Sequence, residues 1–209
     1  MGVSPPIKLK AMIELKQFNE LIEKAHKNAI DHGFYEWVVF CEREVRQRQM
    51  LIVSEIAEAM EVDRKKRWLT KETTKELKEI KDGNESCNNF TEYYNLFIKG
   101  SVEEELADIC IRCFDTLGFM SAELDFMDEA FGHVKYRGLK SEMTTDNLWE
   151  LCFFLTQLIM QQSITKVQVY LLVYYCFGWC DEHNIDLLSH IEAKMMYNAK
   201  RPYKHGKSY

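Results

Sequence analysis

The sequence predicts an all-α protein, and three observations support this class. Helix-breaking residues are scarce, because the 209 residues include only three prolines and nine glycines. Apolar residues recur with the three- to four-residue spacing of amphipathic helices over most of the chain. Apolar and polar residues do not alternate over any stretch long enough to suggest a β-strand. We therefore expect one all-helical domain over residues 1–209.

Two long helices are expected first, at residues 9–31 and 35–64. His32 and Gly33 separate them, because glycine is the usual residue just beyond a helix C-terminus. In the second helix, the turn from Glu42 to Gln49 is strongly polar. That turn is expected to face solvent or to line a cleft.

The remainder of the chain is also expected to be helical. A short charged helix is expected at residues 70–80, with a turn at residues 81–86. Ser101 and Glu104 have the spacing of a capping box, in which the serine oxygen accepts from the first turn and the glutamate reaches back. The box opens a helix that is expected to run through Leu117 and to end at Gly118. Three further helices are expected at residues 146–162, 165–182 and 185–200.

Composition and charge exclude several classes of protein. The net charge of −6 and the pI near 5.6 argue against a general nucleic-acid binder, which would carry a basic stripe. The longest apolar runs, at residues 151–160 and 167–180, are too short or too polar to span a bilayer. Residues 1–6 lack the apolar core of a secretory signal. A cytoplasmic protein with no membrane partner is the expectation.

The seven cysteines include two pairs, Cys110-x-x-Cys113 and Cys176-x-x-x-Cys180, that a zinc site would use. Both pairs lie within apolar helical runs, whereas zinc ligands are usually presented by tight loops. Free cysteine is among the most buried residue types, and thiols stay reduced in the cytosol. We therefore expect buried, reduced thiols at these positions.

The candidate metal-binding and catalytic residues are two acidic pairs, Glu55 with Glu58 and Glu105 with Asp108. Each pair has a spacing of three residues, which places both carboxylates on one helical face about one turn apart. Apolar residues separate the acids in both pairs, which suits helices that pack closely while aiming carboxylates into a shared cleft. Four converging carboxylates would repel one another unless a hard cation neutralised them. Surface charge without a function would give the same spacing.

The residues around these pairs resemble the MazG-like superfamily of all-α nucleoside triphosphate pyrophosphohydrolases. The stretch from Leu51 to Glu61, LIVSEIAEAME, is similar to the family's first motif helix. The stretch from Val102 to Arg112, VEEELADICIR, is similar to the second. Residues 184–207 resemble the closing helix and tail of many members. The resemblance covers residues 33–64, 101–117 and 165–209, and it implies an antiparallel helical bundle.

The resemblance implies a hydrolase that cleaves a nucleoside triphosphate to monophosphate and pyrophosphate, by attack of water at the α-phosphorus. Glu55, Glu58, Glu105 and Asp108 are the implied ligands of Mg²⁺, for which Mn²⁺ is a possible substitute. Either Glu55 or Glu58 is alternatively the catalytic residue that orients the water. Two other functions stay open. One is a non-catalytic module that senses nucleotides or docks a protein, and the other is a structural bundle whose acids lie apart.

Substrate-binding residues are expected on the last helix, in the tail and before the first motif. Lys194, Asn198 and Arg201 share one helical stripe, where the family tail implies phosphate binding. A basic helix C-terminus favoured by the helix dipole would show the same pattern. Lys204, His205 and Lys207 are expected to close over the triphosphate. Trp37 is expected either to stack on the base or to belong to the core.

Two segments depart from the family pattern. The gap at residues 59–104 is longer than usual and is a candidate lid or specificity element, and residues 118–164 are expected to be an additional helical insertion. Family members usually assemble as dimers or tetramers, so a homodimer or homotetramer is implied. Apolar surface for this assembly is expected at residues 148–160 and 167–179. The identity of the base does not follow from the sequence, nor does a choice between standard and damaged nucleotides.

Overall fold

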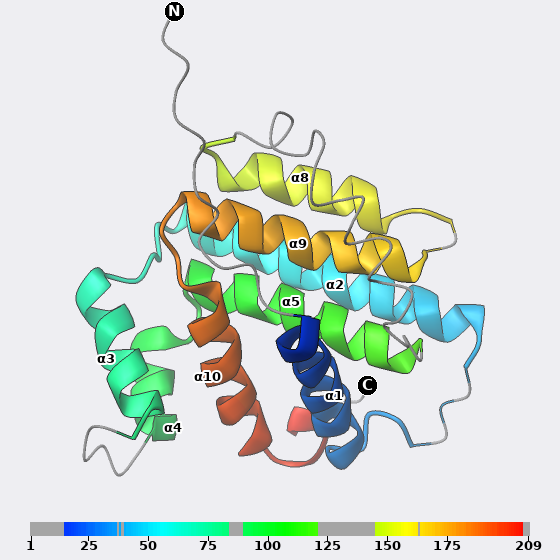
Figure 1. Ribbon diagram of the computed structural model, residues 1–209, viewed down its shortest axis with the longest axis horizontal. Coiled ribbons are helices and arrows are strands. Elements are labelled where there is room, and N and C mark those ends of the chain that lie inside the picture. Colours follow the sequence, from blue (N-terminus) through cyan, green and yellow to red (C-terminus); the bar gives the residue numbers. More distant parts are fainter. Residues whose placement is uncertain are drawn as a thin grey trace, which may run out of the picture.

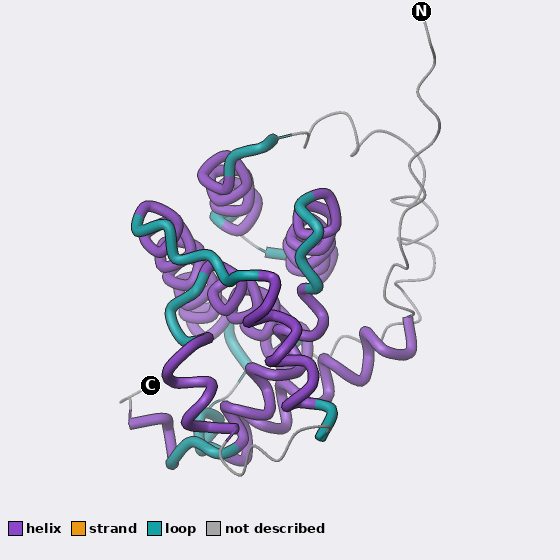
Figure 2. Tube along the Cα trace, turned by 90° about the vertical axis from the view of Figure 1, so that its left-hand side faces the viewer, coloured by secondary structure: helices purple, strands orange, loops and turns teal. Residues whose placement is uncertain are grey.

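The computed structural model describes residues 15–36, 38, 40–83, 90–120, 145–162 and 164–206. Within these ranges the protein has eight α-helices and no β-strand, which confirms the all-helical class (Figure 1). Figure 2 shows that helices make up most of this trace and that loops join them. No helix in this part of the chain is both long and apolar enough to cross a bilayer.

The helix α5 (Val102–Phe119) is the centre of the fold (Figure 1). Most of its side chains are buried, because neighbouring helices pack on several of its sides. These neighbours are α1 (Leu15–Asp31), α2 (Glu42–Arg64), α9 (Lys166–Glu182) and α10 (Leu187–Ala199). The second acidic pair therefore lies within the fold and not on a solvated outer helix.

The helix α8 (Leu148–Ile159) packs against α2 and α9 and belongs to the main core. It lies within residues 118–164, the segment expected as an insertion. Residues 121–144 of this segment lie outside the described part of the chain. The helix α8 is shorter than the expected helix at residues 146–162. The side-chain amide of Gln49 on α2 donates to the backbone carbonyls of Ile159 and Gln161, at 2.8 and 3.0 Å. These bonds satisfy carbonyl groups where the helix ends.

A smaller apolar cluster lies beside the main core and joins α10 to the segment before α5. The helix α3 (Lys71–Lys81) confirms the expected charged helix, and the hydroxyl of Thr70 accepts from the Thr73 N–H to cap it. The helix α4 (Phe90–Tyr93) continues into a π-helix, η1 (Tyr94–Ile98), neither of which the sequence indicated. The buried members of the cluster are Leu77, Ile80, Phe90, Tyr94, Ile98, Ala193 and Tyr197.

The prediction that the second helix starts at residue 35 is wrong, because α2 begins at Glu42. Gly33 follows α1 with φ +79°, a conformation that glycine adopts readily. The chain then places the Tyr35 hydroxyl 2.6 Å from the Asp115 carboxylate of α5. Cys41, with φ −155°, is still extended. Contacts with the end of α5 thus outweigh the helix propensity of residues 35–41, a weak preference that tertiary context routinely overrides.

The prediction that Gly118 ends the third long helix is also wrong, because α5 continues to Phe119. The side chain of His26 on α1 lies against this glycine. A Cβ at position 118 would come within 2.5 Å of the His26 Cβ. Gly118 therefore permits close packing of α1 on α5 and does not terminate the helix.

The N-terminus of α5 confirms half of the expected capping box. The Ser101 hydroxyl accepts from the Glu104 N–H at 3.2 Å, as expected. The Glu104 carboxylate, however, accepts from the Gly100 N–H instead of reaching back to Ser101. Its other oxygen pairs with Lys194 of α10. Glu104 therefore lines the cavity and also accepts a hydrogen bond at the start of the helix.

The last two long helices occur where the sequence predicts them. Thr165 and Gln168 form a complete capping box at the start of α9. Asp186 caps α10, its carboxylate accepting from the Ser189 N–H at 3.2 Å. A 3-10 turn, η2 (Tyr203–Gly206), follows α10.

Candidate functional site

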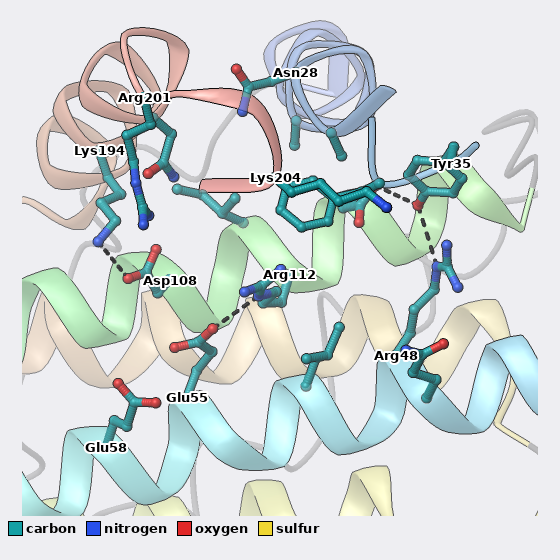
Figure 3. A pocket seen from close by; sticks show the side chains of 18 of the residues that line it. Asn28, Tyr35, Arg48, Glu55, Glu58, Asp108, Arg112, Lys194, Arg201 and Lys204 are labelled. Carbon is teal, nitrogen blue, oxygen red and sulfur yellow. Dashed lines mark hydrogen bonds and ion pairs between the residues drawn. The ribbon is translucent and has the colours of Figure 1, made fainter. Parts of the chain in front are cut away.

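A cavity of about 610 Å³ lies between α2 and α5 on one side and α1, α10 and the C-terminal tail on the other (Figure 3). Its volume is in the range of small-molecule sites, roughly 300–1,000 Å³. Seven of the predicted site residues line it: Glu55, Glu58, Glu105, Asp108, Lys194, Asn198 and Arg201. Trp37 and Lys207, also predicted, lie outside the described residues.

Three of the four predicted acids converge at one end of this cavity. Glu55, Glu105 and Asp108 each offer a carboxylate oxygen within 4.8 Å of the others. The helices approach closely here because Ala59 and Ala107, both fully buried, are small. The alternative of a structural bundle with separated acids does not match this arrangement.

The fourth acid, Glu58, stands apart from the three converging carboxylates. It lines the same cavity one turn along α2, but its side chain is exposed (Figure 3). Among the described residues, the only group of three metal-ligand side chains close enough to share one ion is Glu55, Glu105 and Asp108. Glu58 is therefore an accessible carboxylate at the edge of this group.

Burial and crowding both disfavour ionisation of these acids. Burial, followed by repulsion from Asp108 and other carboxylates, raises the pKa of Glu105 to about 8. Burial and Asp108 also raise the pKa of Glu55, although Arg112 counteracts part of this effect. Acids that resist ionisation for these reasons gain from a nearby cation, which stabilises the charged form.

Two basic side chains already lie against the acidic cluster. The Lys194 ammonium is 2.6 Å from an Asp108 oxygen and also pairs with Glu104. Burial acts to lower the pKa of Lys194, but attraction by Asp108 and Glu104 raises it overall. The Arg112 Nε donates to Glu55 at 2.9 Å. This hydrogen bond crosses from α5 to α2 and joins the two acidic helices.

The wall opposite the acids is formed by α10 and the tail. Asn198 is buried, and its side-chain oxygen has no hydrogen-bond partner in the described part of the chain. Arg201 also lines the cavity (Figure 3), and its backbone N–H donates to the Asn198 carbonyl at 3.1 Å. Lys204 is also part of the lining, and its backbone N–H donates to the His32 carbonyl at 2.9 Å. These residues place cationic and amide groups across from the carboxylates.

The tail is held over the cavity by a close contact with the turn after α1. The Tyr203 ring occupies the space where a side chain at position 33 would lie, since a Cβ there would be 2.1 Å from its Cε2. The Tyr203 hydroxyl also donates to Glu36. Gly33 is therefore required both for its positive φ and for the seating of the tail.

Comparisons with protein-family models, with curated proteins and with solved structures found no match for this chain. The chemistry of the cavity must therefore be inferred from its own residues.

Several residues of the cavity escaped the sequence analysis. The capping box accounts for Glu104 only as a helix cap, and its pairing with Lys194 needs α10, because the two residues are 90 positions apart. Tyr35, Arg48 and Asp115 form a polar group at the other end of the cavity. The polar turn from Glu42 to Gln49, expected to face solvent or to line a cleft, is the one sequence signal for this end. It does both, because Glu44, Gln47 and Arg48 line the cavity while Glu42, Arg43 and Arg46 are exposed.

Proposed function

We propose that the protein is a cytoplasmic, magnesium-dependent nucleoside triphosphate pyrophosphohydrolase of the MazG-like type, which releases nucleoside monophosphate and pyrophosphate. The observation that carries the proposal is the cavity itself. Three carboxylates from two helices converge at one end of it, and basic and amide side chains face them. This arrangement suits a polyanion that binds together with a divalent cation.

The donor atoms fit magnesium. Glu55, Glu105 and Asp108 offer only oxygen ligands, which hard cations prefer. In the structure the positive charges of Lys194 and Arg112 lie against these carboxylates, so the cluster already attracts cations. A bound Mg²⁺ would supply charge neutralisation for the phosphates and would make water more acidic, and Mn²⁺ would be its substitute.

The remaining residues of the cavity have one of two proposed roles, to orient the attacking water or to bind the phosphates. Glu58 is accessible and lies at the edge of the cluster, so we assign it, rather than Glu55, the orientation of the attacking water. Lys194 and Arg201 offer positive charge to the phosphate oxygens, and Asn198 offers its side-chain amide.

The test is incubation of the purified protein with Mg²⁺ and a panel of ribo- and deoxyribonucleoside triphosphates, assayed for pyrophosphate. We expect turnover of at least one of them. Asp108→Asn should abolish turnover while the helical circular dichroism is retained. Asp31→Asn, the same change on the exposed end of α1, is the matched control and should be active. Nucleotide binding without any hydrolysis would favour the alternative, a non-catalytic sensing or interaction module.

We also propose a homodimer or homotetramer. Residues 167–179 contribute mainly to the core of the subunit, so less of this run is available than expected. Trp149, Phe153 and Met160 of α8 and its end, in contrast, are more than half exposed. Sedimentation of Trp149→Glu/Phe153→Glu should show a smaller assembly than the parent protein, and a monomeric parent would refute the proposal.

A further inference from the structure

The cavity extends about two helical turns beyond the acidic cluster. On α2, Arg48 precedes Glu55 by seven residues, and on α5, Asp115 follows Asp108 by seven residues. Both intervals correspond to about 10 Å along the helix axis. Arg48 and Asp115 both line the cavity, so they mark its far end. A separation of this order is what a nucleotide needs between its phosphates and its base.

The far end combines apolar walls with a polar group. Apolar residues of the cavity lining include Ala25 and Ala29 of α1, Phe34 in the turn after α1, Val38 and Leu51, and of these Ala25 and Phe34 directly precede His26 and Tyr35 in the chain. Side chains of this kind suit the faces of a flat heterocycle, while polar groups recognise its edge.

Asp115 is held in one orientation by two donors. His26 Nδ1 donates to its Oδ1 at 2.9 Å, and the Tyr35 hydroxyl donates to the same oxygen at 2.6 Å. Burial, helped by Asp115, raises the pKa of Tyr35, so this hydroxyl stays protonated and donates. Within the described residues no hydrogen bond uses Oδ2 of Asp115, which therefore remains an acceptor.

Arg48 lies beside this carboxylate and is equally well fixed. Its Nε donates to the Tyr35 hydroxyl at 3.3 Å, and its Nη1 donates to the Glu44 carbonyl at 3.1 Å. The guanidinium stacks on the Phe119 ring at 3.7 Å from the centroid. In the part of the chain that is described, its Nη2 makes no hydrogen bond and remains a donor. Tyr35 thus links Asp115, which has a free acceptor oxygen, to Arg48, which has a free donor, and Figure 3 shows its bond to Arg48.

We propose that this far end is a nucleobase subsite, in which Asp115 accepts a ring N–H and Arg48 donates to the adjacent carbonyl oxygen. An N–H beside a C=O is present in uracil, thymine, guanine and hypoxanthine. Cytosine and adenine instead present an exocyclic amine beside an unprotonated ring nitrogen. The subsite therefore selects oxo bases over amino bases. This inference rests on the proposed function, because it assumes that the phosphates lie at the acidic end.

The Asp115→Asn variant tests the subsite sharply. His26 and Tyr35 both donate to Oδ1, so they orient the new amide with its oxygen at that position. The amide NH₂ then replaces Oδ2, and an acceptor becomes a donor. We expect kcat/KM for oxo-base triphosphates, relative to cytidine and adenosine triphosphates, to fall about 10- to 100-fold, the usual effect of one hydrogen bond to a charged group.

Controls separate this effect from general damage. Inorganic triphosphate, which has no base, should inhibit the variant and the parent equally, and their melting temperatures should be similar. Asp31→Asn should leave the base preference unchanged. Arg48→Gln should weaken the same preference, which provides a second variant if Asp115→Asn does not fold.

The outcomes also separate the two proposals. Calorimetric titration with uridine, guanosine, cytidine and adenosine monophosphates measures base preference without catalysis. If the parent binds oxo bases preferentially but hydrolyses no triphosphate, the proposed function fails and the subsite stands. If the parent hydrolyses triphosphates without base preference, or if Asp115→Asn leaves its preference unchanged, the subsite is refuted.

Discussion

The central helix α5 carries two clusters of potential metal ligands that differ in their access to ligands. Glu105 and Asp108 line the cavity and meet Glu55 of α2. Cys110 and Cys113 are fully buried, and they interact with cysteines of α9. Both clusters bring reactive side chains from two helices together within the core.

The two clusters differ in what surrounds them. Burial raises the pKa of Cys110, Cys113 and Cys180 well above the ordinary value of a thiol. A protonated thiol is a poor nucleophile and a poor metal ligand. The carboxylates are also penalised by burial, but Lys194 and Arg112 lie against them and the cavity gives a ligand access. Chemical capacity thus depends on counter-charge and access, and not on the clustering of side chains alone.

The largest expected effect is a loss of activity that follows substitution in the acidic cluster but not in the cysteine cluster. In the proposed function Glu55 is a metal ligand, so Glu55→Gln should lower kcat/KM for triphosphate hydrolysis by more than about 100-fold, because even outer-shell partners of a metal are worth 10- to 100-fold. Cys113→Ala should keep the activity of the parent and lose only stability, by about 1–3 kcal/mol, measured by urea unfolding. Equal activity of Glu55→Gln and Cys113→Ala would remove the distinction between the clusters.

The counter-charge of the acidic cluster is tested by Lys194→Met. This change leaves Glu104 buried without its cation, so the free energy of unfolding should fall by about 3–5 kcal/mol. Lys27→Met removes an exposed ion pair with Asp31 and should cost less than about 1 kcal/mol. Chemical denaturation of both variants in EDTA makes the comparison. Similar losses would show that Lys194 does not compensate a buried charge.

A smaller effect concerns the pH dependence of stability. Because folding raises the pKa of Glu105 from 4.5 to about 8, the folded state binds its proton more tightly than the unfolded state. The stability contributed by this group is full below about pH 4.5 and is lost as the pH rises through about 8. In EDTA, Glu105→Gln should therefore raise the melting temperature at pH 8.5 relative to the parent, but not at pH 4.5. Mg²⁺ should raise the melting temperature of the parent more than that of the variant. The contradicting result would be a parent protein that, without metal, becomes more stable from pH 5 to pH 8.5 by the same amount as the variant.

Much of the secondary structure follows from local sequence. Scarce proline and three- to four-residue periodicity predict the helical class, and the capping serine Ser101 locates the start of α5. These signals are local because a cap and an amphipathic stripe involve residues within a turn or two of one another. The acidic pairs belong to the same category, since spacing alone places each pair on one face.

The tertiary structure decided which of these faces meet. The late start of α2, the continuation of α5 through Gly118 and the pairing of Glu104 with Lys194 all depend on contacts between distant segments. The same holds for the Asp115 group, whose partners His26 and Tyr35 precede it by 89 and 80 residues. Sequence alone determined most of the helices and the acids available to the site. Packing decided their shared cavity, because burial, counter-charge and access are properties of neighbours in space that no local pattern encodes.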